Sequence, residues 1–345
     1  MTITKEVRQT ITGTAFYCAG GLIFTVMPAY LGGVGRALGV DAVALGTLSA
    51  VELWAIALAS LTGPLWINRF DRRALAALGA VIALVGQCLT LFLSDYWALL
   101  SVRAATGLLG EGVLLTLSYA LLGQTQHPER SFGIAFGTSI ILGTLCLYMG
   151  PELDKASGTS GAILILAALE LLALALCAFA SLHHGPEPSP YTKPMADNQR
   201  KGASLSVGAF ALVGQAVWYA GAGGFWSFTE QMASLMNILP VNIAHALGIG
   251  TSAALLGTFV TVTIGDRFGR MVPVVISTLL IALSVFAFAR SSNLGPVTLE
   301  LAIFNIFWAS GTIYATAAAC SIDEKGRIAV LVPAFQVIGM AIGTS

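Results

Sequence analysis

The sequence predicts an all-α fold, a polytopic bundle of transmembrane helices. Of its 345 residues, 56% are hydrophobic and only 10% are charged, whereas soluble domains carry about 25% charged residues. Eleven mainly apolar stretches are close to the roughly 20 residues that a helix needs to cross a bilayer. Most Lys and Arg residues lie in every second connection between these stretches, which would place them on one side of a membrane, as is typical of membrane proteins. This composition disfavours a water-soluble enzyme, a nucleic-acid binder or a disordered chain.

The expected spans follow one another with short connections in all but one place. They cover residues 10–33, 43–67, 74–93, 98–123, 131–150, 160–182, 205–234, 241–264, 272–290, 296–319 and 328–345. The exception, residues 183–204, is rich in proline and charged at its end, which is typical of a solvated linker. We therefore expect an N-terminal six-helix half over 1–182, a cytoplasmic linker over 183–204 and a C-terminal half over 205–345. Because the chain stops inside an apolar stretch, we expect a twelfth span beyond it.

The distribution of Lys and Arg predicts a cytoplasmic N-terminus. With that orientation, thirteen of the cations lie on the cytoplasmic side, three lie outside, and Arg103 lies within the fourth span. The positive-inside rule makes this asymmetry the main determinant of orientation. We expect a multi-pass protein of a bacterial inner membrane or a plasma membrane.

Short matches near an offset of 200 residues indicate a parallel repeat of two halves. They pair Phe16-Tyr17 and Gly20-Gly21 with Trp218-Tyr219 and Gly223-Gly224, residues 68–72 with 266–270, and Glu129-Arg130 with Glu324-Lys325. The matches lie in order, and they fall at equivalent points of two six-span units. This arrangement keeps the same topology in both halves.

The loop Gly265-Asp266-Arg267-Phe268-Gly269-Arg270 resembles the signature loop of the major facilitator superfamily, and residues 63–73 resemble its first copy. The first copy departs from the pattern, with Asn68 where Asp is expected and Asp71 where Gly is expected. Arg103 to Gly107, with Gly110, resembles the fourth-span motif of the family. The resemblance implies two six-helix bundles that open a central site alternately to each side, and it leaves the substrate open.

The two cationic loops have a physical interpretation of their own. An Asp at a helix start accepts hydrogen bonds from free N–H groups, and Arg can bridge to neighbouring carboxylates or helix ends. Such a cluster can form ion pairs in one conformation and break them in another, which would make it a latch. The alternative is a plain turn with cytoplasmic anchors. The candidate latch residues are Arg69, Asp71, Arg72, Gly265, Asp266, Arg267, Gly269 and Arg270.

Ionisable residues at membrane depth mark the strongest candidate site. A charged side chain in the hydrocarbon costs roughly 2.5–3.5 kcal/mol on insertion scales, so its presence indicates a function or a partner. Helical rise puts Arg103 about 8 Å and Glu52 about 13 Å from one surface, close enough in depth for an ion pair. Glu111 lies near the middle of the same span as Arg103.

Three roles remain open for this group. Arg103 can hold an anionic substrate, it can orient Glu52 or Glu111 as a proton site, or the pair can be a fixed structural bridge. Burial disfavours an ionised carboxylate and a nearby Arg favours it, so protonation would respond to displacement of the pair. Glu170 lies midway along the sixth span, and the sequence does not indicate a role for it.

The seventh span carries a second candidate cluster. Gln215, Tyr219 and Trp226 recur with Glu230 at helical spacing. We expect Gly221, Gly223 and Gly224 to interrupt this helix, as glycine-broken spans do at transporter sites. Tyr17 is the first-half counterpart, and Asn305 adds a hydrogen-bonding group in the tenth span. Glu230 and Glu300 are expected to reach toward the outer surface.

The sequence shows neither a catalytic set nor a phosphate-binding loop, so we expect no enzyme activity, no cofactor and no metal. We predict a secondary active transporter of a small organic solute, with Arg103 favouring an anion or amphipath. Intramembrane carboxylates favour coupling to protons. The expected partners are the solute, the proton and the lipid bilayer, with no nucleic acid, and the protein is expected to be a monomer. The alternatives are an uncoupled facilitator and a non-transporting membrane sensor or scaffold.

Overall fold

The computed structural model describes residues 5–67, 69–122, 125, 128–157, 161–177, 205–265, 267–320 and 327–345. Within these residues the chain forms helices and turns, with no strand. The expected linker, 183–204, and the loop residues Asn68 and Asp266 lie outside the described residues.

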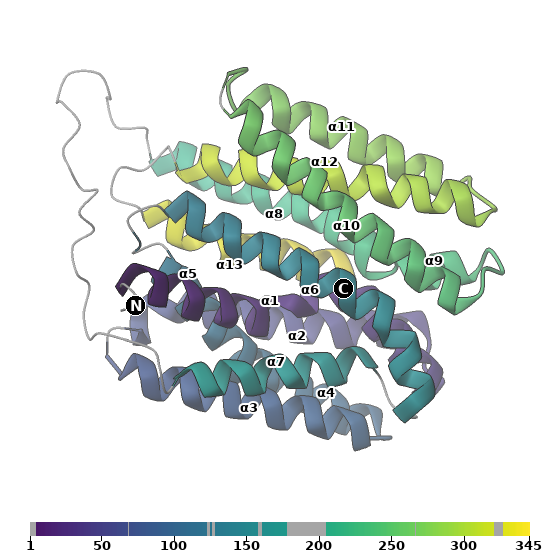
Figure 1. Ribbon diagram of the computed structural model, residues 1–345, viewed down its shortest axis with the longest axis horizontal. Coiled ribbons are helices and arrows are strands. Elements are labelled where there is room, and N and C mark those ends of the chain that lie inside the picture. The colour runs from purple at the N-terminus through teal and green to yellow at the C-terminus, as the bar shows by residue number, and fades with distance from the viewer. Residues whose placement is uncertain are drawn as a thin grey trace. The chain divides into compact units, whose positions relative to one another are not determined.

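The helices follow the expected spans closely (Figure 1). They are α1 (Lys5–Leu38), α2 (Ala42–Trp66), α3 (Arg72–Phe92), α4 (Tyr96–Ala105), the π-helix η1 (Thr106–Glu111), α5 (Gly112–Leu122), α6 (Pro128–Ser157), α7 (Gly161–Cys177), α8 (Leu205–Ser227), α9 (Thr229–Ser234), α10 (Pro240–Ile264), α11 (Met271–Phe288), α12 (Leu294–Cys320) and α13 (Arg327–Thr344). Each expected span coincides with one helix or with consecutive helices, so the sequence prediction of an all-α bundle is confirmed.

Eight helical segments among the described residues are long and apolar enough to cross a membrane. Many of their large apolar side chains are exposed, as a lipid solvent permits. On α11, Val275, Leu279, Leu283 and Phe286 recur at helical spacing, and more than half of each side chain's surface is exposed. This face is suited to hydrocarbon and not to water.

The chain packs into two compact units. The first contains residues 1–23, 51–139 and 163–202, and the second contains 24–50, 140–162 and 203–345. Helices α1, α2, α6 and α7 therefore contribute to both units. The division into halves at residues 183–204 stays a prediction.

The first unit has a core of mainly small and aliphatic side chains, with one phenylalanine, from α1, α3, α5 and α7. It includes Phe16 and Ala19 of α1, Ala76 and Ala80 of α3, Leu114, Leu117 and Leu121 of α5, and Ala173 and Cys177 of α7. The alanines let the helix axes approach closely, as is common where membrane helices pack without a hydrophobic driving force.

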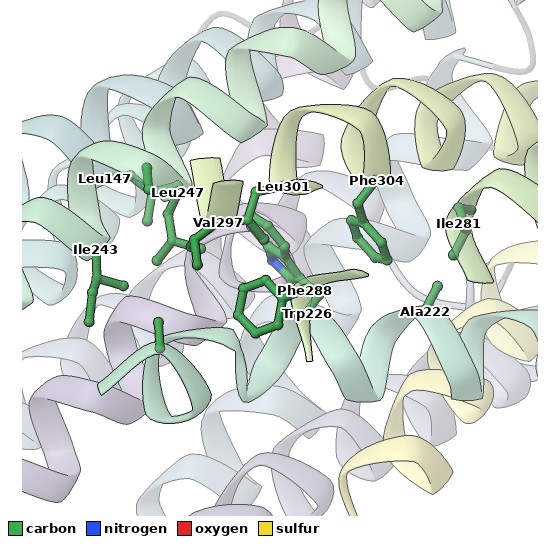
Figure 2. Close-up of a cluster of buried hydrophobic side chains, with 12 residues drawn as sticks. Leu147, Ala222, Trp226, Ile243, Leu247, Ile281, Phe288, Val297, Leu301 and Phe304 are labelled. Carbon is green, nitrogen blue, oxygen red and sulfur yellow. The ribbon is translucent and has the colours of Figure 1, made fainter. Parts of the chain in front are cut away.

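The second unit has an aromatic core. Figure 2 shows Trp226 and Phe288 together near its centre, with Phe304 and Leu301 beside them. The rings of Trp226 and Phe304 are stacked, with centroids 6.2 Å apart. Around this core α12 packs against both α10 and α11, and α8 packs against α13.

Candidate functional site: a buried cluster of carboxylates and arginine

A π-helical turn shapes the fourth span. Helix α4 carries Arg103, η1 follows from Thr106 to Glu111, and α5 continues the span. A π-turn forms i→i+5 hydrogen bonds and is frequently found at functional sites. Its wider turn rotates the residues that follow it back relative to a regular α-helix. The sequence places Glu111 about 80° around the helix from Arg103 at 3.6 residues per turn, yet the two side chains meet.

Arg103 binds two carboxylates at once. Its Nη2 atom donates to Oε1 of Glu52 on α2 and, at 3.1 Å, to Oε1 of Glu111. All three side chains have no exposed surface. The contact that similar depths suggested between Glu52 and Arg103 is present, and Arg103 also contacts Glu111.

Gln87 of α3 completes the cluster. Its side-chain oxygen accepts from Arg103 Nη1 at 2.9 Å, and its Nε2 atom donates to Glu111 Oε1 at 2.9 Å. The amide is fully buried and bridges the cation to the second carboxylate. Sequence reasoning missed this residue, although an amide in the apolar run 74–93 was a usable signal.

Glycine allows the helices to approach closely enough for these contacts. A Cβ atom at Gly107 would lie 2.7 Å from the backbone oxygen of Glu52, and one at Gly110 would lie 2.9 Å from Ala83 of α3. Real Cβ contacts are essentially never this short. The fourth-span glycines therefore set the spacing of α2 and α3 around Arg103.

The cluster carries more negative than positive formal charge. One guanidinium faces two carboxylates, and one oxygen of each carboxylate, Glu52 Oε2 and Glu111 Oε2, has no hydrogen-bond partner among the described residues. An unpaired buried charge is so costly that such groups take up a proton instead. This arrangement can bind and release protons when its ion pairs change.

The second unit holds a separate network of uncharged polar groups. Gln336 Nε2 donates to Gln215 Oε1 at 3.3 Å and to Thr316 Oγ1 at 3.1 Å. The hydroxyls of Tyr219 and Thr312 lie 3.1 Å apart. Gln215 and Tyr219 share the buried face that their spacing predicted, and Gln215 Nε2 has no partner among the described residues.

Trp226 and Glu230 connect α8 and α9 to α1. Trp226 Nε1 donates to the backbone oxygens of Phe24 and Thr25, at 3.2 and 3.1 Å. Glu230 forms an ion pair with Arg36. The expectation that Glu230 reaches toward the surface is wrong, because its side chain is only 5% exposed and is held by this cation.

The expected break of the seventh span at its glycines is also wrong. Helix α8 runs through them to Ser227, and the break falls at Phe228, before α9. A Cβ atom at Gly223 would lie 2.7 Å from Met340 Cγ of α13. Gly223 and Gly224 therefore serve helix packing, whereas a Cβ atom at Gly221 would meet nothing within 4 Å. The sequence alone cannot distinguish helix packing from helix breaking.

Two other candidate residues make local contacts. The ring of Tyr17 lies 5.2 Å from that of Phe136 and 6.0 Å from that of Tyr119, centroid to centroid. Asn305 Nδ2 donates at 2.9 Å to the backbone oxygen of Leu301 in its own helix.

The first cationic loop begins α3. Asp71 is the N-cap, and its Oδ1 atom accepts from the backbone N–H of Ala74 at 2.7 Å. Arg72 is buried, and its Nε atom donates at 3.4 Å to the backbone oxygen of Ile67. Arg69 precedes the cap in the turn.

The second cationic loop joins α10 to α11. Gly265 and Gly269 both have positive φ, 59° and 68°, a conformation that glycine adopts without strain. Tyr314 donates to the backbone oxygen of Gly265 at 2.8 Å. Arg267 and Arg270 lie in the turn and at the start of α11, while Asp266 lies outside the described residues.

The apolar helices and the buried ion cluster are those of a polytopic membrane protein. The sequence profile of the Major Facilitator Superfamily matches residues 10–344, and the chain belongs to this family. A comparison with curated proteins gave no match. Within the described residues, no group of three or more His, Cys, Asp or Glu side chains is arranged to hold a metal ion.

Solved transporter structures share the fold. A bacterial homologue of the human lysosomal transporter Spinster, inward-facing and unoccupied, is 14% identical with a TM-score of 0.67, covering 100% of this chain and 82% of that chain. A D-xylose–proton symporter is 16% identical with a TM-score of 0.72, covering 98% and 88%. The nucleoside transporter NupG is 14% identical with a TM-score of 0.67, covering 99% and 89%. These likenesses concern the fold alone.

Proposed function

We propose that the protein is a proton-coupled secondary active transporter of a small organic solute. The observation that carries the proposal is the fully buried cluster of Glu52, Arg103 and Glu111. Buried ionisable groups in membrane helices are costly and typically mark proton or substrate pathways. Both the fold and the D-xylose–proton symporter among its structural neighbours are consistent with this function.

Coupling follows from competition for Arg103. An anionic group of the solute that binds the guanidinium displaces Glu52 or Glu111 from it. The released carboxylate lies in a low-dielectric site without its cation, so it takes up a proton. Solute and proton then bind together, and the net charge of the site stays nearly constant. This scheme favours an anion or an amphipath with an anionic group.

We propose that transport proceeds by alternating access. With the N-terminus in the cytoplasm, the contacts of Trp226 with α1 and of Glu230 with Arg36 lie toward the outer surface. In the same unit Tyr148 of α6 lies 5.5 Å from His245 of α10, ring centroid to ring centroid. These contacts support a closed outer end in this conformation. The two cationic loops are proposed as latches on the cytoplasmic side.

The uncharged network of the second unit is a second group of residues that we propose to bind solute. Gln215, Tyr219 and Asn305 supply amide and hydroxyl groups, and Trp218 and Trp308 lie against Tyr219 with ring centroids at 5.4 and 6.2 Å. Such groups suit the hydroxyls and apolar faces of a small solute. We propose that the transporter acts as a monomer in a bacterial inner membrane or a plasma membrane.

The test is flux in proteoliposomes under an imposed pH gradient, screened against organic anions, amphipaths, sugars and nucleosides. We expect at least one solute to accumulate when the gradient is present and not when it is collapsed. Flux that ignores the gradient would identify an uncoupled facilitator. Silence across the whole panel would favour a sensor or scaffold and contradict transport.

A further inference from the structure

Gln87 closes a ring of three hydrogen bonds with Arg103 and Glu111. Arg103 Nη1 donates to Gln87 Oε1 at 2.9 Å, and Gln87 Nε2 donates to Glu111 Oε1 at 2.9 Å. Arg103 Nη2 donates to the same Glu111 oxygen at 3.1 Å. All three side chains are fully buried. Glu52 stands outside this ring, because within the described residues its carboxylate has a hydrogen bond only with Arg103.

The charges of its two neighbours fix which way the Gln87 amide points. A guanidinium only donates hydrogen bonds, and an ionised carboxylate only accepts them. The amide has one accepting end and one donating end, so its oxygen must face Arg103 while its nitrogen faces Glu111. The observed contacts have this polarity. The ring is therefore complementary to the ionised form of Glu111.

Protonation of Glu111 reverses what this carboxyl requires from Gln87. An acid O–H is a donor, and a buried donor without an acceptor is costly. The Glu111 Oε2 atom has no hydrogen-bond partner among the described residues, whereas Oε1 faces Gln87. An O–H on Oε1 finds its acceptor when the amide turns its oxygen from Arg103 toward Glu111. The turned amide then presents its NH2 group to Arg103 Nη1, and two donors cannot share a hydrogen bond.

This rearrangement removes two acceptors from Arg103 at once. The turned amide no longer accepts from Nη1, and the protonated Oε1 atom of Glu111 is a poor acceptor for Nη2. The ion pair with Glu52 remains. A buried guanidinium that has lost these two acceptors binds an anionic group more tightly, because hydrogen bonds between two ionised partners are the strong ones.

The helices around η1 leave these two residues as the direct partners of Glu111. Helices α1 to α5 all pack against η1. Within the described residues, only Arg103 and Gln87 hydrogen-bond to the Glu111 side chain. Protonation of Glu111 therefore acts first on these two side chains. The titratable groups on the surrounding helices of the unit are Tyr17 and Cys18 of α1, Glu52 of α2, Arg72, Arg73 and Cys88 of α3, Tyr96 and Arg103 of α4, Tyr119 of α5 and Glu170 of α7.

We propose that Gln87 is a positioning residue that transmits protonation of Glu111 to Arg103 and so raises the affinity of Arg103 for an anionic group. A proton from solvent forms the O–H bond on Glu111, the amide turns, and the anion binds the guanidinium. The charge of the proton balances that of the anion. By linkage, the bound anion raises the proton affinity of Glu111 by the same factor. This inference rests on the proposed proton coupling, and it leaves Glu52 as the lasting counter-ion.

Infrared difference spectra between acid and neutral pH test the turning of the amide and need no solute. The full-length protein is prepared with glutamine that is isotope-labelled at its side-chain carbonyl. We expect acidification to produce two components, the C=O stretch of the Glu111 acid and a labelled glutamine component that is lost in Gln87→Leu. Both should be lost in Glu111→Leu, which removes the carboxyl without adding a second labelled amide.

Further variants separate this role from a structural one. Gln231→Leu removes a side-chain amide of the second unit and should leave both components unchanged. If Gln87→Leu does not fold, Gln87→Met keeps the length of the side chain and should lose the glutamine component equally. The inference is overturned by a wild-type spectrum without either component, or by a glutamine component that persists in Glu111→Leu.

Benzoate binding to the purified protein measures the effect on Arg103. We expect the affinity for benzoate to rise about tenfold from neutral to mildly acid pH, a typical coupling between two sites. Gln87→Leu should abolish this rise, whereas a merely structural loss would lower the affinity equally at both pH values. Benzamide, which carries no charge, is the control and should show no such rise. A wild-type affinity for benzoate that does not increase with acidity, or an equal increase in Gln87→Leu, would contradict the link.

Failure of the proposed function has a different signature. If no solute accumulates under a pH gradient in proteoliposomes while the glutamine component depends on Glu111, proton-coupled transport fails and the link through Gln87 is retained. If solute accumulates but acidification produces no glutamine component, coupling is retained and the inference about Gln87 is wrong.

Discussion

The guanidinium of Arg103 and the carboxylate of Glu52 form an ion pair in which neither side chain has exposed surface. The pair joins α4 to α2 inside the first unit, and Glu111 and Gln87 complete its coordination. Taking two charges out of water costs several kcal/mol per ion in real proteins. A pair this costly is retained for stability only when its geometry is fully satisfied, whereas one oxygen of each carboxylate here has no hydrogen-bond partner within the described part of the chain.

Replacing the cation tests how strongly the cluster depends on it. Arg103→Gln leaves Glu52 and Glu111 without a charge partner, so we expect a loss of about 3–5 kcal/mol in unfolding free energy and loss of transport. The loss of stability should grow as the pH rises, because the folded variant keeps its carboxyls protonated while the unfolded chain releases those protons. Thermal unfolding in detergent at several pH values measures this effect.

The double variant Arg103→Gln with Glu52→Gln is the matched control. Removing both charges together should restore part of the stability without restoring transport, since only Glu111 is then left without a charge partner. Equal instability of the single and double variants would contradict the charge argument.

Gln87 should be needed for the geometry of the cluster. Gln87→Leu keeps the volume but removes the bridge between Arg103 and Glu111, so each buried group loses a partner. We expect a loss of about 1–3 kcal/mol and a weaker pH dependence of uptake. Gln87→Leu with unchanged stability and uptake would show that the bridge is dispensable.

Gly107 should tolerate no side chain. Gly107→Ala places a methyl group against the Glu52 backbone oxygen, and we expect a loss of about 1–3 kcal/mol as α2 is pushed away. The matched control is Gly137→Ala on α6, where a Cβ atom meets nothing within 4 Å. That substitution should be neutral or stabilising by up to about 1 kcal/mol, because Ala favours helix. Similar melting temperatures for the two variants would contradict the packing argument.

The ion pair between Arg36 of α1 and Glu230 of α9 should keep the contact between these two helices closed. Glu230→Gln removes the charge but keeps the shape, and we expect faster labelling of a single reporter cysteine at Thr229, which is fully buried. The native cysteines are removed in this background. Glu300→Gln is the control and should leave the labelling rate unchanged. Slower or equal labelling in Glu230→Gln would show that this ion pair does not hold that contact closed.

Much of the fold was predictable because apolar run length and cation placement are properties of the sequence itself. Helix limits, the Asp71 cap and the contact of Glu52 with Arg103 all follow from local pattern and depth. The role of Gln87 was not predictable, because a single amide in an apolar run does not reveal which helix faces it. The π-turn that brings Glu111 to Arg103 depends on tertiary packing and has no clear signature in the sequence.

The glycines of α8 also show that tertiary packing cannot be read from the local sequence. A glycine lowers helix propensity, which favoured a break at Gly221 to Gly224. Close packing of Gly223 against Met340 keeps the helix intact there. Propensity is a weak prior, and the neighbouring helix that overrides it lies more than a hundred residues further along the chain.

The most direct test of the central claim is pH-gradient-driven solute accumulation in proteoliposomes, comparing the wild-type protein with Glu111→Gln. Glu111 is one of the two carboxylates that pair with Arg103, and Gln87 also donates to it. The account predicts that the wild type accumulates solute only when the gradient is present, and that Glu111→Gln loses this accumulation but still exchanges solute. Accumulation by Glu111→Gln with the wild-type dependence on the gradient would contradict it.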